Sequence, residues 1–117
     1  MLFRSWLAIN STHAKNNSDN KSIADEWKLN HPILNDSDGT VGKEYSAKST
    51  PHMFIIDKEG KLAYAGGIDN EAIGDPNAPL KEGTVNYVEK ALTELQSGTS
   101  VSTPETKSYG CSVKYKK

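Results

Sequence analysis

The strongest structural signal in the sequence is a pair of apolar segments joined by a short polar turn. His52–Ile56 and Leu62–Ala65 are rich in aliphatic and aromatic residues, which are favoured in β-strands. Asp57–Gly60 lies between them and has the composition of a tight turn, with a glycine where a positive φ is needed. The pattern predicts an antiparallel β-hairpin.

A helix is predicted to cover one face of this hairpin. Residues 84–96 carry apolar side chains at helical spacing, and Gly98 marks the end of the helix. The apolar positions are Val85, Val88, Leu92 and Leu95. Gly66–Gly83 has no periodicity, so it is predicted to be an irregular connector between hairpin and helix.

The first part of the chain predicts a strand, a loop and a helix. Leu2–Ile9 is a nearly continuous apolar run, which is typical of an interior strand buried on both faces. Ser11–Asn20 is polar and favours a loop. Ser22 and Asp25 have the spacing of a capping box, which predicts a short amphipathic helix that ends before Pro32.

Two short elements connect this region to the hairpin. Ile33–Leu34 predicts a minimal strand, and Gly39–Tyr45 has the spacing of a short helix. The order of strands and helices predicts an α/β domain with a mixed sheet. We expect its core to contain Trp6, Trp27 and Phe54, since each falls on an apolar face.

Length and charge limit the classes of function. The chain has 117 residues, enough for one hydrophobic core, and we divide it into a domain over 1–98 and a tail over 99–117. Its formal charge of -1 provides no electrostatic footprint for nucleic acid, and no apolar run is long enough to span a membrane. The first ten residues do not form an export signal, so a cytoplasmic location is the default expectation.

A single cysteine further restricts the chemistry. Cys111 alone excludes an intrachain disulfide, a Cys-x-x-Cys redox pair and a thiolate zinc cluster within these residues. The three histidines, His13, His31 and His52, lack the spacing of metal ligands. We therefore expect neither a metal nor a cofactor.

Two motifs carry a family resemblance. Ala47–Asp57 contains Thr50–Pro51 at the entrance of the hairpin, and with that hairpin it resembles the second half of a redoxin. Redoxins are the group of thioredoxin-fold proteins that contains the peroxiredoxin-like proteins. Pro104–Tyr115 resembles the Gly-Cys-x-x-Lys-aromatic ending of a peroxiredoxin-like subgroup. Together with Trp6–Ser11 and Asn86–Leu92, the resemblance covers nearly the whole chain.

The resemblance implies a fold and an activity. The fold is thioredoxin-like, in a partial form with the order β-α-(α)-β-β-α. Thr50 and Pro51 are then the substrate-binding residues, with a cis peptide between them that lets Thr50 present its backbone to an extended substrate. The implied activity is thiol–disulfide exchange or antioxidant peroxide reduction, and the implied partners are protein thiols, disulfides or a peroxide.

The sequence departs from this family at its most important point. Family members carry their reactive cysteines at the start of a helix that follows a central strand, and these 117 residues resemble only the portion after that helix. No catalytic residue is therefore assigned, and the N-terminal strand and catalytic helix are expected to be missing. A sheet without its middle strand has an unpaired edge, which favours association with a second copy.

Three interpretations of function remain open. Cys111 is a candidate redox thiol, since nearby lysines such as Lys107 and Lys114 favour the thiolate, although lone cysteines are commonly inert apolar residues. In the first interpretation the chain is a thiol oxidoreductase that is inactive alone. In the second it is a non-catalytic module that binds peptides at Thr50–Pro51. In the third it is a fragment without independent function.

Overall fold

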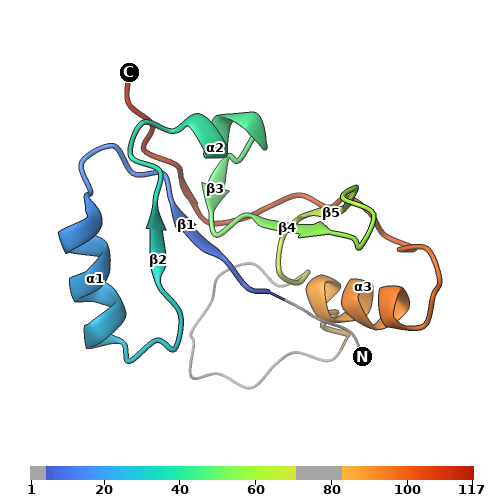
Figure 1. Ribbon diagram of the computed structural model, residues 1–117. Helices are drawn as coiled ribbons and strands as arrows, with labels where there is room; N and C mark the ends of the chain where they lie inside the picture. Colours follow the sequence, from blue (N-terminus) through green and yellow to red (C-terminus); the bar gives the residue numbers. More distant parts are fainter. Residues whose placement is uncertain (1–4, 71–82) are drawn as a thin grey trace. The chain divides into compact units, whose positions relative to one another are not determined.

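The computed structural model describes residues 5–70 and 83–117 of a small protein with mixed α/β structure (Figure 1). The elements in chain order are β1 (Ala8–Asn10), α1 (Asn17–Glu26), β2 (Ile33–Asn35), α2 (Thr40–Glu44), β3 (Ser49–Thr50), β4 (Met53–Ile56), β5 (Leu62–Gly66), α3 (Tyr87–Gln96) and β6 (Cys111–Ser112). Two compact units are present. The first comprises Met1–Ala47 with Val113–Lys117, and the second comprises Lys48–Ser112.

The first unit is built on a parallel pair of strands. β1 pairs with β2, with Ile9 opposite Leu34. The minimal strand predicted at Ile33–Leu34 is present as part of β2. Helix α1 packs against β2, and the side-chain amide of Asn10 donates a hydrogen bond of 2.8 Å to Asn20 on this helix. The predicted short helix near Gly39–Tyr45 is present as α2.

Helix α1 begins earlier than the sequence predicts. Its capping box is formed by Asn16 and Asp19, not by Ser22 and Asp25. The Asn16 side chain accepts the Asp19 N–H at 2.9 Å, and the Asp19 carboxylate accepts the Asn16 N–H at 3.1 Å. These bonds satisfy backbone donors that a helix start leaves free, so the residues from Asn17 to Asn20 form the first turn and not a loop.

The predicted burial of the first strand and of two tryptophans is wrong. Of the run Leu2–Ile9, only Ala8 and Ile9 are in β1, and residues 1–4 lie outside the described part of the chain. Trp6 and Trp27 are 56% and 65% exposed, and Ile9 is 44% exposed. A pair of strands with a helix on one side leaves the other face to solvent. Phe54 is half-buried and stacks on His52.

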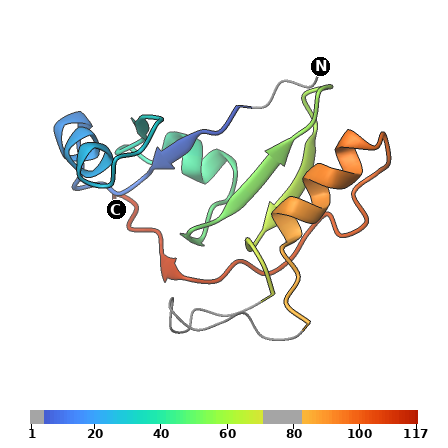
Figure 2. The same cartoon turned by 90° about the horizontal axis from the view of Figure 1, so that it is seen from below.

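The second unit contains the predicted hairpin and its covering helix. Strands β4 and β5 are antiparallel, and Gly60 takes a φ of +81° in the turn. The Asp57 side chain accepts hydrogen bonds from the N–H groups of Glu59 and Lys61, which fixes the turn. Helix α3 lies along the hairpin (Figure 2), and the core of this unit consists of Ile55, Tyr64, Val88 and Ala91.

The start of α3 differs from expectation. Asn86 caps α3 by accepting the Glu89 N–H at 2.9 Å, so the helix begins at Tyr87 and Val85 stays outside it. Most of the predicted connector Gly66–Gly83 lies outside the described residues.

The residues that the sequence sets apart as a tail over 99–117 are integrated into the fold. The backbone of Ala65 on β5 exchanges hydrogen bonds of 3.0 and 3.1 Å with Pro104 and Thr106. Further along, β6 pairs with β3. Over the described residues the strands form three separate two-stranded sheets, in place of the single mixed sheet that the sequence predicts.

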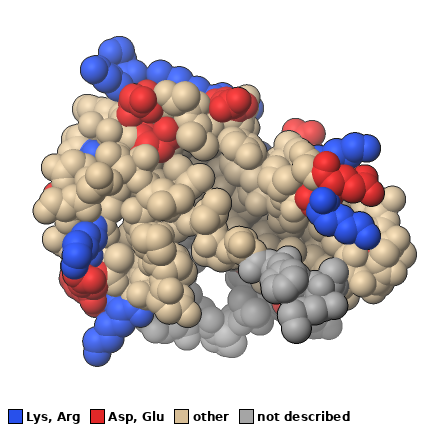
Figure 3. All heavy atoms as spheres, viewed as in Figure 1, with Lys and Arg blue, Asp and Glu red and all other residues tan. Residues whose placement is uncertain are grey.

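Charged side chains of both signs are interspersed on the visible face of each unit (Figure 3). An exposed ion pair joins Lys21 and Asp25 at 2.9 Å, and such pairs contribute little to stability. Among the helices of the described residues, none has the length and apolar character needed to cross a membrane.

Candidate functional site

The candidate site is the bend at Thr50–Pro51, where β3 ends and the chain turns into β4. The Thr50–Pro51 peptide bond is cis, which confirms the prediction for this bond. The Ser49 hydroxyl donates a hydrogen bond of 3.1 Å to the carbonyl oxygen of Pro51. This bond links the residues on either side of Thr50. Both Thr50 and Pro51 are exposed to solvent.

Cys111 lies directly opposite Thr50. In the antiparallel pair of β3 and β6, Ser49 faces Ser112 and Thr50 faces Cys111. Side chains of directly opposite residues project to the same face of a sheet, with Cβ atoms about 5 Å apart. Because Thr50 and Cys111 are both exposed, the thiol and the cis-proline bend are accessible on the same sheet. The structure therefore brings together residues that the sequence assigns to separate regions.

A glycine makes this pairing possible. Gly110 has a φ of +131°, a conformation that side chains rarely adopt. A Cβ atom at this position would overlap the carbonyl oxygen of Thr50. The glycine next to Cys111 is thus required for the close approach of β6 to β3.

Within the second unit, two tyrosines hold the segment before β6 against the hairpin. The Tyr109 hydroxyl donates a hydrogen bond to the carboxylate of Asp69. The fully buried Tyr64 donates to the carbonyl oxygen of Gly67 at 2.5 Å, and its hydroxyl lies 2.6 Å from that of Thr106. These contacts hold residues 106–109 against the hairpin and so set the position of Cys111.

His52, the residue after Pro51, also supports the bend. Its Nδ1 accepts the Lys48 N–H at 3.1 Å, and its ring stacks on Phe54 with 4.4 Å between centroids. Burial, together with the positive charge of Lys48, lowers the pKa of His52 below its ordinary value. The lowered pKa favours the neutral ring, in which Nδ1 accepts the Lys48 N–H. The sequence analysis assigns His52 no role in the site. Its position directly after Pro51 is the one sequence feature that links it to the bend.

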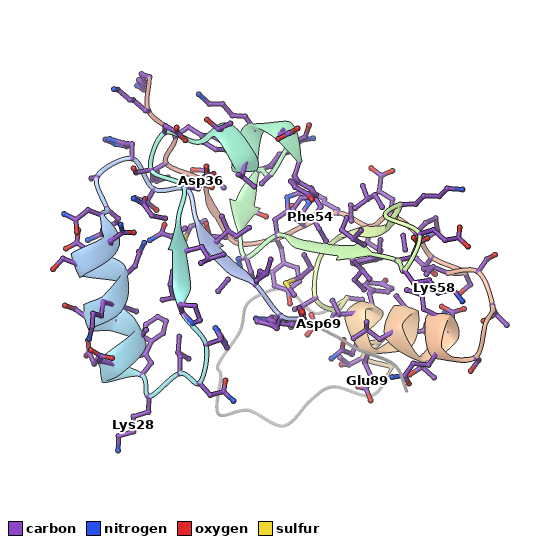
Figure 4. All side chains as sticks on the ribbon, viewed as in Figure 1. Lys28, Asp36, Phe54, Lys58, Asp69 and Glu89 are labelled. Atoms are coloured by element: carbon purple, nitrogen blue, oxygen red, sulfur yellow. The ribbon has the colours of Figure 1, made fainter. Side chains whose placement is uncertain are left out.

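A second polar cluster surrounds Asp36 in the first unit, where β2 leads into α2 (Figure 4). The Asp36 carboxylate is 5% exposed and accepts hydrogen bonds from the Ser11 hydroxyl at 2.6 Å, the Gly42 N–H at 2.8 Å and the Val41 N–H at 3.0 Å. Burial by itself raises the pKa of Asp36, but these hydrogen bonds outweigh it and hold the pKa below the ordinary value. This carboxylate supplies the acceptors that the start of α2 needs.

Tyr115 closes over this cluster. Its hydroxyl donates to the carbonyl oxygen of Ala47 at 2.7 Å, and a Cβ atom at Gly42 would lie 2.7 Å from that hydroxyl. Burial, with the nearby charge of Asp36, raises the pKa of Tyr115. The cluster has a complete structural role, so we do not assign it a chemical one.

Metal binding finds no support in the described geometry. Within residues 5–70 and 83–117, no three histidine, cysteine or acidic side chains come together as candidate ligands. His13, His31 and His52 are accordingly not assigned to a shared site.

Comparison with known proteins finds solved structures of similar fold. No family model matches the sequence, and no curated protein matches it. A solved structure of a hypothetical protein from Sinorhizobium meliloti is similar over 94% of this chain, with a TM-score of 0.77 and 25% identity. A solved structure of an uncharacterised conserved protein from Geobacillus kaustophilus is similar over 96% of the chain, with a TM-score of 0.76 and 30% identity.

Both solved proteins are longer than this chain. The match covers 61% of the Sinorhizobium protein and 60% of the Geobacillus protein. This chain therefore spans about three fifths of the length of either. The similarity shows a shared α/β architecture. The two solved proteins are described only as hypothetical or uncharacterised.

Proposed function

We propose that the chain has a thioredoxin-like fold of the redoxin group and provides the substrate side of a thiol–disulfide exchange reaction. Thr50–Pro51 binds an extended polypeptide that carries a thiol or disulfide, and Cys111 exchanges with it. The observation that carries this proposal is the register pairing of two exposed residues, Thr50 and Cys111, at a cis-proline bend.

The shape of the site supports binding of an extended chain. A strand that ends in an exposed bend offers backbone groups to an added polypeptide, which is a common mode of peptide recognition. Ser49 and His52 hold the bend through hydrogen bonds within residues 48–52, so little order has to be gained on binding. Cys111 lies opposite the last residue of the strand, where a sulfur atom of a bound polypeptide comes within reach.

The chemistry is a simple exchange. The Cys111 thiolate attacks one sulfur of the partner's disulfide and forms a mixed disulfide, while the other sulfur leaves as a thiolate and takes up a proton. No net oxidation or reduction occurs in this step. Because the chain has one cysteine, a thiol from another molecule must release the bound partner. A peroxide would instead oxidise Cys111 to a sulfenic acid and be reduced to water or an alcohol.

The second candidate function is binding without chemistry. It is favoured by the single cysteine, which leaves the chain without a resolving thiol of its own. In this case Thr50–Pro51 holds an extended peptide and Cys111 is dispensable. Peptide affinity of a Cys111→Ser variant separates the two functions, because only exchange requires the thiol.

An exchange assay tests the main proposal. The probes are a cysteine-containing peptide and a small thiol, each activated as a disulfide with the same thiopyridyl leaving group. We expect the peptide to react about tenfold faster than the small disulfide, a difference of ~1.4 kcal/mol in the activation free energy. Pro51→Ala should abolish this preference and leave the rate with the small disulfide unchanged, and Cys111→Ser should release no thiopyridone. Equal rates for both probes with the unmodified protein would contradict the proposed binding role.

A further inference from the structure

The imidazole of His52 connects the two ends of the cis-proline bend. Its Nδ1 accepts the N–H of Lys48, the residue before β3, at 3.1 Å. His52 itself follows Pro51 and leads into β4. The hydrogen bond therefore encloses residues 49–51, so the proposed binding site for an extended polypeptide lies within the loop that this bond closes.

The position of the His52 ring is set by β4. The ring stacks on Phe54 with 4.4 Å between centroids and 22° between the ring planes, and Phe54 is one of the four residues of β4. The imidazole cannot turn away from Lys48 without losing this stacking. A change in the ring's hydrogen bonding therefore acts on the Lys48 side of the bend.

The hydrogen bond requires an uncharged ring. A neutral imidazole has one nitrogen that accepts and one that donates, whereas both nitrogens of an imidazolium are donors. Protonation at Nδ1 places a hydrogen atom against the Lys48 N–H, which removes the acceptor and brings two donors face to face. The bond between Lys48 and His52 is then lost, and the remaining side-chain bond across the bend is that of Ser49 to Pro51.

The surroundings of the ring also oppose its positive charge. Burial, followed by the charge of Lys48, lowers the pKa of His52 below its ordinary value of 6.5. Phe54 on β4 is uncharged, and β6 places Cys111, which can titrate, and Ser112 opposite the two residues of β3. The hydrogen bond is thus complete above pH 6.5 and is lost as the pH falls through the lower pKa of the folded protein.

We propose that His52 is a positioning residue that makes polypeptide binding at Thr50–Pro51 depend on pH, because the neutral ring holds the bend in its binding form and the protonated ring releases it. This inference rests on the proposed binding role of the bend and adds its regulation. It requires no chemistry at Cys111, so it applies whether a bound polypeptide undergoes exchange or is only held.

The test measures peptide affinity by titration calorimetry between pH 8 and pH 5. The probe is a peptide with capped ends and an S-methylated cysteine but no titratable side chain, so it neither exchanges nor changes its own charge. We expect the affinity to fall about fivefold toward pH 5, the effect of losing one hydrogen bond. The midpoint should coincide with the pKa of His52 measured by nuclear magnetic resonance.

Three variants separate the charge of the ring from its other contacts. His52→Asn places an uncharged amide oxygen close to the position of Nδ1 and should remove the pH dependence while retaining binding. His52→Phe keeps an aromatic ring for the stacking but has no acceptor, so it should bind weakly at both pH values. His13→Asn changes an exposed histidine of the first unit and should keep the pH profile of the unmodified protein.

A second readout follows the bend without any peptide. The Lys48 amide proton should move upfield as His52 becomes protonated, because it loses its acceptor. A Lys48 amide that does not respond, or an affinity that is the same at pH 8 and pH 5, overturns the pH control and leaves the proposed binding role intact. A pH profile that persists in His52→Asn overturns it as well. If the peptide does not bind even at pH 8, the proposed function itself is refuted, and the pH control with it.

Discussion

Replacement of Asp36 by alanine should destabilise the first unit strongly. The carboxylate is the acceptor for three donors, the Ser11 hydroxyl and the N–H groups of Val41 and Gly42. An unsatisfied buried donor costs about 1–3 kcal/mol. The hydroxyl can rotate toward another acceptor, but the two N–H groups are fixed by the helix. We therefore expect Asp36→Ala to lower the free energy of unfolding by about 3 kcal/mol, a large part of the 5–15 kcal/mol typical of a domain.

Urea denaturation followed by far-ultraviolet circular dichroism measures this loss. The matched control is Asp19→Ala in the same unit, because the Asp19 carboxylate accepts a single N–H, that of Asn16, in an exposed hydrogen bond of 3.1 Å at the start of α1. Loss of such an exposed cap costs about 1 kcal/mol or less. If the two variants lose the same stability, the burial of Asp36 is not the cause and the reasoning fails.

The same carboxylate predicts a pH dependence. Its pKa in the folded protein lies below the ordinary value of 3.8, so the unfolded chain binds its proton first as pH falls. The stabilising contribution of Asp36 is complete above the pKa of the unfolded state and is lost as pH falls toward the lower folded pKa. Between pH 5 and pH 2, unmodified protein should therefore lose more stability than Asp36→Ala. Parallel acid profiles for the two proteins would refute the assigned hydrogen bonds.

Three further predictions concern the second unit. Tyr64→Phe removes a fully buried hydroxyl with two partners and should lower the free energy of unfolding by about 1–3 kcal/mol, measured by urea denaturation. Gly110→Ala should separate β6 from Thr50, and hydrogen exchange at the paired amides should then become faster, whereas unchanged exchange would contradict the overlap. The His52 imidazole, followed by nuclear magnetic resonance, should titrate below the ordinary pKa of 6.5, and Lys48→Ala should move its pKa upward; an unmoved pKa would exclude the charge effect.

The hairpin and α3 are predictable because their signals are local. A turn such as Asp57–Gly60 is fixed by one side chain that accepts two nearby N–H groups and by a glycine with positive φ. The start of α1 is a different case. Its first turn is polar and lacks apolar periodicity, and the acceptors that allow it come from Asn16 and Asp19, a pattern hidden within an asparagine-rich stretch.

Burial and pairing depend on partners distant in sequence, so they were harder to predict. The apolar run ending at Ile9 was expected to be buried on both faces, but only one helix of the described residues covers its sheet. The bend at Thr50–Pro51 was predicted from a motif, and its cis bond is confirmed. The position of Cys111 opposite Thr50 is not predicted. The strand that contains Cys111 has only two residues and therefore no sequence pattern of its own.

The C-terminal motif shows how structural and chemical constraints can be separated. Gly110 is explained by the close approach of its backbone to Thr50, and Tyr115 by its packing over Gly42 and its hydrogen bond to Ala47. Cys111 stands between them with an exposed side chain, so packing does not account for a thiol at this position. Cys111 lies opposite Thr50 at the cis-proline bend, so it is the residue on which the proposed exchange depends. For this reason the exchange assay on Cys111 is more informative about function than any measurement of stability.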